Sequence, residues 1–244
     1  MRNQVLPHPP VLRAVDTVIS TLKKNGHNLI EWTPYKHGFA VDMINGIFAA
    51  DGSTVSHQGY PAPRTMKADN GKDVYSDISA SGEPAIPNIK ELLNPDSPKI
   101  DLNQLWEVNL QKWAYQTEYL TLWREAEARL GNGQTLDAII APVTASAAIR
   151  HDRFKYYGYA TVVNLLDFTS AVVPVTFADK TVDKKIEKHT PMNALDADVQ
   201  EEYDPEAYDG APVAVQVIGR RLSEEKTLAI AEEVGRLLGN VVTP

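Results

Sequence analysis

The sequence predicts a globular protein of the α/β class, and one observation supports each part of this prediction. Segments with helical spacing of apolar residues alternate with short apolar runs that are typical of buried strands. The composition is that of a globular domain: 43% of the 244 residues are hydrophobic and 23% are charged. No linker, internal repeat or low-complexity tract divides the chain, so we expect one domain over residues 1–244.

The first quarter of the chain predicts helix, strand and helix. Pro9 and Pro10 suit a helix entrance, and the helical spacing that follows ends at Asn25-Gly26. A short strand is expected over residues 28–32 and a second helix over residues 35–50. Prolines and glycines recur from residue 51 to residue 98, which indicates an irregular stretch with short helices.

The longest predicted helix begins after Asp101, a good N-cap, and ends at Gly131. It carries three tryptophans, which we expect to pack in the core because large aromatic rings bury much area, although an aromatic ligand platform is the alternative. Three apolar runs then predict strands buried on both faces. They cover residues 137–142, 170–177 and 213–219.

The acidic stretch between the last two strands predicts a surface excursion. Residues 179–209 contain ten acidic residues and four lysines with few apolar ones, so we expect this charge to serve solvation. A final helix is predicted from its N-cap Ser223 to Gly239, with two glutamates in its first turn.

Charge and cysteine content exclude several function classes. With 24 Lys and Arg against 32 Asp and Glu, the net charge is 24 − 32 = −8, which disfavours nucleic-acid or anionic-membrane partners. The absence of cysteine excludes disulfides, thiolate zinc sites and cysteine nucleophiles, and favours a cytoplasmic location. The sequence also shows no secretory h-region and no apolar run of membrane-spanning length.

Four local motifs are better explained by structure than by chemistry. Ser20-Thr-Leu-Lys23 has Ser-x-x-Lys spacing but sits on an ordinary amphipathic helix. The patch Ser79-Ala-Ser81-Gly82-Glu83 lacks the paired glycines of an oxyanion loop, and His151-Asp152 is an isolated doublet. Gly131-Asn-Gly133 ends a helix instead of opening one after a strand. No metal site or cofactor is therefore predicted.

Several longer motifs, in their order along the chain, carry a family resemblance. Near the C-terminus these are the runs that begin at Arg150, Asn164 and Gly210, the last of which contains Pro-Val-Ala-Val-Gln-Val-Ile-Gly. Earlier motifs are His8-Pro-Pro-Val, Gly26-His27 with Glu31-Trp32, Ala50-Asp51-Gly52, Ser81-Gly-Glu-Pro and Leu105-Trp-Glu-Val-Asn. Together they resemble the C-terminal portion of an amidase signature enzyme of the fungal acetamidase-like branch.

The resemblance implies a fold and a chemistry. The family fold is one large α/β/α domain with a mixed sheet covered by helices, of which this chain resembles the C-terminal half. Members hydrolyse carboxamides through a Ser-cis-Ser-Lys triad. No position in this sequence matches the triad, so no catalytic residue is assigned. Tyr157, Tyr159 and Asn164 are implied to line the acyl pocket, although structural packing is the alternative reading of these residues.

Three functions follow from the resemblance. The first is an amidase-family polypeptide without activity of its own, whose substrate class is a small aliphatic amide. The second is a subunit of a split amidase completed by an N-terminal partner chain. The third is a noncatalytic amide-binding or interaction protein. As half of a domain, the chain is expected to expose strand edges over residues 138–141 and 213–218 and to self-associate.

Overall fold

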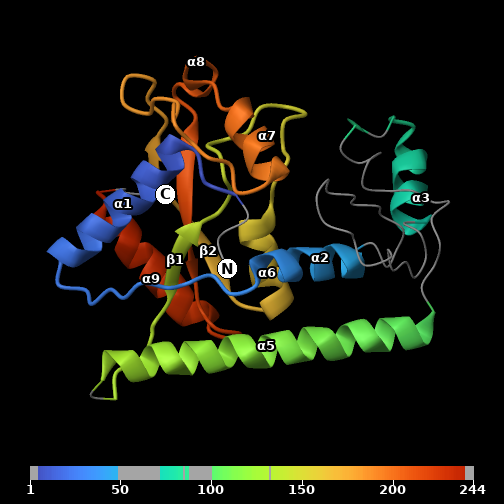
Figure 1. Ribbon diagram of the computed structural model, residues 1–244, viewed down its shortest axis with the longest axis horizontal. Coiled ribbons are helices and arrows are strands. Elements are labelled where there is room, and N and C mark those ends of the chain that lie inside the picture. Colours follow the sequence, from blue (N-terminus) through green and yellow to red (C-terminus); the bar gives the residue numbers. More distant parts are fainter. Residues whose placement is uncertain (1–4, 49–71, 85, 88–100, 132, 240–244) are drawn as a thin grey trace.

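The computed structural model describes residues 5–48, 72–84, 86–87, 101–131 and 133–239 (Figure 1). Its centre is a three-stranded sheet in the order β1-β3-β2. The strands are β1 (Ile139–Pro142), β2 (Ser170–Phe177) and β3 (Pro212–Ile218), and β3 is antiparallel to both neighbours. Because helices cover this sheet on both sides, the predicted α/β class is confirmed.

One face of the sheet packs on the first and last helices. Val213, Val215 and Val217 alternate along β3 and are almost fully buried against α1 (Pro9–Lys24) and α9 (Glu224–Leu237). Figure 1 shows these two helices on the same side of the sheet. Both helices occur where the apolar spacing predicted them, because that spacing gives each helix one stripe to bury.

The other face packs on α6 (Gly158–Leu166) and on the C-terminal half of α5 (Leu102–Leu130). Ile139, Val163, Ile218 and Trp123 form a buried cluster there. The helix α2 (His37–Phe48) packs between α5 and α6 through its own buried residues. The strand expected over residues 28–32 is wrong, since residues 27–35 have neither helical nor strand structure.

The irregular stretch predicted from residue 51 to residue 98 lies largely outside the described residues. The described part contains α3 (Lys72–Ser81). At the end of this helix, Ser81 Oγ donates to the carbonyl oxygen of Ile78 and accepts from the Glu83 amide. Ser81 therefore has the loop role that the sequence favoured over a nucleophile.

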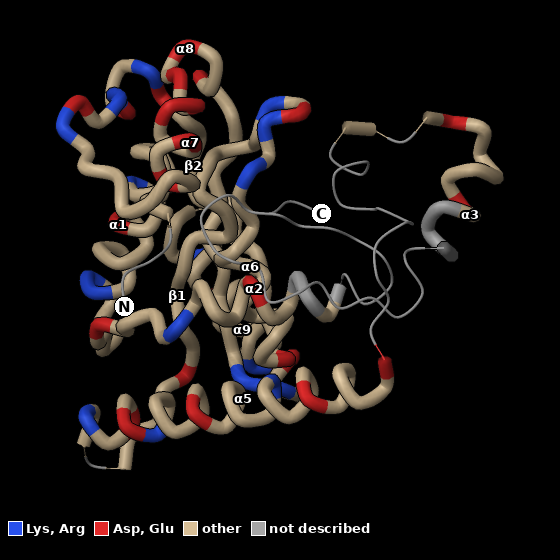
Figure 2. The backbone as a smooth tube through the Cα atoms, turned by 45° about the vertical axis from the view of Figure 1, so that its right-hand side comes forward, with Lys and Arg blue, Asp and Glu red and all other residues tan. Residues whose placement is uncertain are grey.

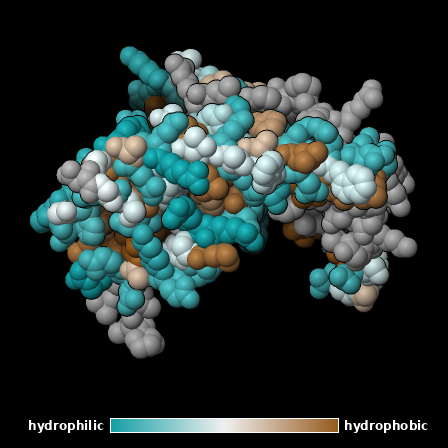
Figure 3. All heavy atoms as spheres, turned by 90° about the horizontal axis from the view of Figure 1, so that it is seen from below, coloured by the Kyte–Doolittle hydropathy of each residue, from teal (hydrophilic) through white to brown (hydrophobic). Residues whose placement is uncertain are grey.

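The helix α5 begins as predicted but packs differently from the prediction. Asp101 and Gln104 form a reciprocal capping box, with both bonds at 2.9 Å. Trp123 is 1% exposed, whereas Trp106 and Trp113 are 58% and 68% exposed. The expectation that all three rings lie in the core is therefore wrong for two of them. In Figure 3, which looks from the side on which α5 lies, hydrophobic side chains reach the surface.

The strand edges also differ from expectation. The segment expected to be an exposed edge at residues 213–218 is the central strand β3, paired on both sides. In the described part of the chain, the outer edges are those of β1 and β2. On β2, Val172 and Phe177 are 59% and 65% exposed, so this strand is not buried on both faces. Pro174 fits an edge strand, because proline cannot donate to a ladder.

The acidic segment is built into the core instead of serving only solvation. It includes α7 (Ala194–Glu202) and α8 (Pro205–Tyr208), and Figure 2 shows acidic and basic residues interleaved over it. The side chains of Asp183, Asp196 and Glu202 are 2%, 0% and 4% exposed. A buried carboxylate must be paired, because losing water costs several kcal/mol per ion.

Asp183 and Asp196 tie this segment to the start of the chain. Arg13 donates from Nε and Nη2 to the two oxygens of Asp183, both at 2.7 Å. Asp196 accepts from the Leu6 amide at 2.8 Å and lies 2.7 Å from His189 Nε2. Burial alone raises the pKa of Asp183, but the Arg13 fork and the Asp179 amide outweigh burial and hold that pKa below its ordinary value.

We expect Asp183→Asn to lower the free energy of unfolding by about 3 kcal/mol, because it leaves Arg13 without its charged partner. Urea unfolding measures this loss. The carboxylate's contribution is fully present above pH 3.8, the ordinary pKa of Asp, and is lost as the pH falls through the lower folded-state pKa. The free energy of unfolding of Asp183→Asn should therefore fall less on acidification than that of the parent chain. Glu206→Gln, on an exposed pair with Lys180, is the control and should unfold like the parent.

We expect the isolated chain to self-associate through the open edge of β2. Static light scattering should show mass rising with protein concentration. Val172→Lys places a charge on that edge and should reduce the association, whereas Val182→Lys, at a residue 60% exposed outside the sheet, should not. A compact monomer that melts cooperatively would contradict this prediction.

Candidate functional site

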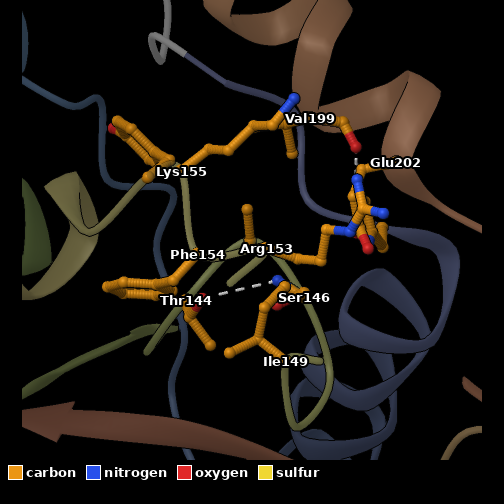
Figure 4. Close-up of a pocket in the computed structure, with 11 residues that line it drawn as sticks. Thr144, Ser146, Ile149, Arg153, Phe154, Lys155, Val199 and Glu202 are labelled. Atoms are coloured by element: carbon orange, nitrogen blue, oxygen red, sulfur yellow. Dashed lines mark hydrogen bonds between the residues drawn. The ribbon is translucent and has the colours of Figure 1, made fainter. Parts of the chain in front are cut away.

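The candidate site is a small cavity between the start of the chain, α7 and the loop that leads from β1 to α6. Its volume is about 10 Å³. In Figure 4, Thr144 and Ser146 from the loop face the side of α7 that carries Val199 and Glu202, and Phe154 and Lys155 stand beside them. Polar side chains, among them those of His8, Thr144 and Ser146, line it, and Tyr156 closes the side next to α6.

His8 forms one wall of the cavity and is completely buried. Its backbone N donates to the Ala145 carbonyl oxygen at 2.7 Å, and its Nε2 lies 2.7 Å from the Val199 carbonyl oxygen. Burial lowers the pKa of His8, so the imidazole is neutral near pH 7. Since a carbonyl only accepts, the Nε2 atom carries the proton and Nδ1 is left as an acceptor.

Two residues that line this cavity each carry a buried side-chain atom with no hydrogen-bond partner among the described residues: His8 Nδ1 and Ser146 Oγ. Ser146 is 5% exposed and directly follows Ala145, to which His8 is bonded. Thr144 Oγ1 accepts from the Ser146 amide at 3.5 Å, which fixes the backbone but leaves the Ser146 hydroxyl unused. Such atoms are unusual in native proteins and mark a place where a partner is expected.

Both carboxylate oxygens of Glu202, which lies beside the cavity, already accept hydrogen bonds. Glu202 accepts from Arg150 at 2.8 Å through Oε1 and from the Tyr208 hydroxyl at 2.6 Å through Oε2. Desolvation by burial, and then the bond to Glu202, raise the pKa of Tyr208, so this phenol stays protonated as a donor. With both oxygens bonded, Glu202 holds α7 to the loop and is not free to act as a general base.

The three residues implied to line a substrate pocket occupy different environments. Tyr159 is buried, and its hydroxyl donates to the Val5 carbonyl oxygen at 2.6 Å. Asn164 is exposed on α6. Tyr157 is half-buried at the N-terminal end of α6, with its ring centroid 5.8 Å from that of Phe154. The structure therefore does not gather the three side chains around this cavity.

The backbone at Gly158 explains how Tyr157 is held. A Cβ atom added at Gly158 would clash with the buried Tyr156 ring, so any other residue here would require that ring to move. The Tyr156 ring is buried and meets Tyr159 edge-on, with ring centroids 5.4 Å apart. This close packing fixes the turn from which Tyr157 projects.

The motifs set aside in the sequence have structural roles or lie apart from the site. Gly131 caps α5 with a φ of 71°, as a helix stop requires. Ser20 and His151 are exposed. Among the described residues, no group of three His, Asp or Glu side chains is arranged to hold a metal ion. The described helices also include none with the length and apolarity needed to cross a bilayer.

A second hollow is larger but chemically plainer. It is a groove of about 620 Å³ between the end of α1, β1 and α9, with Leu22, Leu136 and Ile140 among its apolar lining. On its rim, Lys226 pairs with Asp137 at 2.7 Å. It contains none of the three predicted pocket residues.

Sequence reasoning missed His8, Ser146 and Glu202 as site residues. His8 entered only as part of the His8-Pro-Pro-Val motif, and Glu202 only as part of an acidic run. No local spacing signals their meeting, because His8 lies 191 residues from its partner Val199. The sequence alone gives no sign that His8 is buried, because the residues that bury it lie far away along the chain.

Comparisons with known proteins match the chain to one family. A family model described as "Amidase" matches residues 1–228. The chain is 64% identical over 240 residues to the "Acetamidase" of Emericella nidulans, covering 98% of this chain and 40% of that protein. It is 60% identical over 236 residues to the "Acetamidase" of Aspergillus oryzae, covering 97% and 40%. The chain thus spans about 40% of the length of these relatives.

A solved structure gives the same fold. "Fatty acid amide hydrolase" superposes with a TM-score of 0.79 at 24% identity, over 98% of this chain and 39% of that one. The predicted partial amidase-signature fold is therefore confirmed. At this identity the superposition supports the fold alone.

We expect Tyr159→Phe to lower the free energy of unfolding by about 1 kcal/mol, because it removes the hydroxyl bond to Val5 and leaves that carbonyl without its donor. Asn164→Ala, at an exposed position, is the control and should cost less than about 0.5 kcal/mol. Urea unfolding of both variants tests whether Tyr159 serves packing. Equal stabilities for the parent and Tyr159→Phe would instead leave the hydroxyl available for a ligand.

Proposed function

Because the chain belongs to the amidase family, we propose that it is the C-terminal portion of an acetamidase-like hydrolase, which cleaves the C–N bond of small aliphatic carboxamides. The observation that carries this proposal is the 60–64% identity to two acetamidases over nearly the whole chain. Fold likeness alone would not support it, since one fold hosts many functions.

We further propose that the chain is inactive by itself. Its residues offer no match to the Ser-cis-Ser-Lys triad implied by the family, and the relatives are more than twice as long as the part matched here. The two candidate serines of the sequence support this view: Ser20 is exposed on α1, and Ser81 is engaged at the end of α3. Loss of a triad's nucleophile costs several orders of magnitude in rate.

In this proposal the chain supplies the frame of the acyl pocket. Tyr157 is the strongest of the three implied pocket residues, because it is half-buried beside Phe154, and burial raises the pKa of its phenol, which stays neutral. Tyr159, two residues further along, is anchored in the core, because its hydroxyl donates to the Val5 carbonyl oxygen. Asn164 is exposed here and is proposed to contact the part of the amidase domain that this chain does not match.

The open edges of the structure favour a split or completed enzyme over a noncatalytic binding protein. Trp106 and Trp113 are exposed on α5, and the described strands leave the outer edges of β1 and β2 unpaired. A self-sufficient binding domain normally covers such surfaces. The proposed partner is therefore an N-terminal amidase chain that completes the sheet. A cytoplasmic location stays a prediction from composition.

We expect complementation to restore activity. The test mixes or co-expresses this chain with the part of Emericella nidulans acetamidase that the chain does not match, and follows ammonia release from acetamide at pH 7 to 9. Neither part alone should release ammonia, and a fluorophosphonate should label only the added part. Turnover by the 244-residue chain alone, with labelling of Ser20 or Ser81, would contradict the proposal.

A further inference from the structure

We propose that the cavity between His8 and Ser146 is a binding site for one water molecule, which donates a hydrogen bond to His8 Nδ1 and accepts one from Ser146 Oγ. This inference concerns residues of this chain alone and does not depend on the proposed amidase function.

The first step of the argument is that both atoms require a partner. His8 is 0% exposed and Ser146 is 5% exposed, and in the described part of the chain neither His8 Nδ1 nor Ser146 Oγ has a hydrogen-bond partner. Leaving a buried polar atom unsatisfied costs about 1–3 kcal/mol. Most buried polar atoms in native proteins have a partner, so one partner shared by these two atoms is expected.

The second step is that the atoms are chemically complementary to water. The Val199 carbonyl oxygen, 2.7 Å from Nε2, fixes the tautomer that makes Nδ1 an acceptor. The Ser146 hydroxyl can donate as well as accept. A water molecule can donate to the first atom and accept from the second at the same time. Thr144, on the same cavity wall, offers a further hydroxyl.

The third step is size. The cavity has a volume of about 10 Å³, close to the minimum that holds one water molecule. An aliphatic amide has at least three heavy atoms more than water and does not fit. The Tyr203 ring, with its centroid 4.7 Å from that of His8, closes another side of the imidazole. The volume therefore selects water over the substrate class proposed above.

Such a water has a positioning role. The His8 backbone is already bonded to Ala145, and the water adds a second link from the start of the chain to the loop after β1. That loop continues through Phe154 to Tyr157 at the entrance of α6. The bridge therefore restrains the segment from which Tyr157 projects, as conserved buried waters commonly do.

A high-resolution crystal structure of the chain is the direct test. Electron density for one water within hydrogen-bond distance of both His8 Nδ1 and Ser146 Oγ is expected. An empty cavity would overturn the proposal, and so would a direct bond from Ser146 Oγ to His8 Nδ1.

Nuclear magnetic resonance of ¹⁵N-labelled histidine gives a second readout. Donation by the water should shift the His8 Nδ1 resonance upfield of an unbonded imidazole nitrogen, and Ser146→Ala should move this resonance and speed exchange of the His8 amide proton by about tenfold. Ser20→Ala, which removes an exposed hydroxyl on α1, is the matched control and should change neither. An unchanged His8 resonance in a folded Ser146→Ala variant would overturn the proposal.

Discussion

The pairing of three buried carboxylates is the interaction on which the rest of this structure depends. Asp183, Asp196 and Glu202 come from one acidic segment, and each is held by donors from elsewhere in the chain, chiefly Arg13, the Leu6 amide and Arg150. Since an unpaired charge in such a place is costly, these contacts fix the acidic segment against the start of the chain. They therefore hold the residues before α1, and with them His8, against the acidic segment.

The site follows from that constraint. Once residues 5–8 lie against α7, the His8 ring meets the Val199 carbonyl, and its backbone meets Ala145 in the loop after β1. The same loop then enters α6 through Gly158, where an added Cβ would clash with Tyr156. The half-buried Tyr157 at the entrance of α6 is thus supported by packing and hydrogen bonds along this loop and the start of the chain.

Apolar side chains are buried on one side of the structure and exposed to solvent on another. Valines of β3 are buried under α1 and α9, whereas β2 exposes Val172 and α5 exposes Trp106 and Trp113. This asymmetry agrees with a chain that spans about 40% of its acetamidase relatives. Exposed apolar surface of this kind commonly marks a place where another segment or chain packs.

The sequence by itself determined the α/β class, the extents of α1 and α9, the capped start of α5 and the three strands, because apolar periodicity and capping residues act over a few neighbouring positions. The family motifs likewise identified the amidase resemblance. Only the tertiary structure decided which faces are covered: it removed the strand at residues 28–32, exposed Trp106 and Trp113, and placed residues 213–218 at the centre of the sheet. It also placed three carboxylates of the acidic segment in buried pairs, although the sequence had predicted that this segment serves solvation. It brought His8 and Ser146 to the wall of the same cavity. These features depend on contacts between residues up to 194 positions apart, which local patterns do not encode.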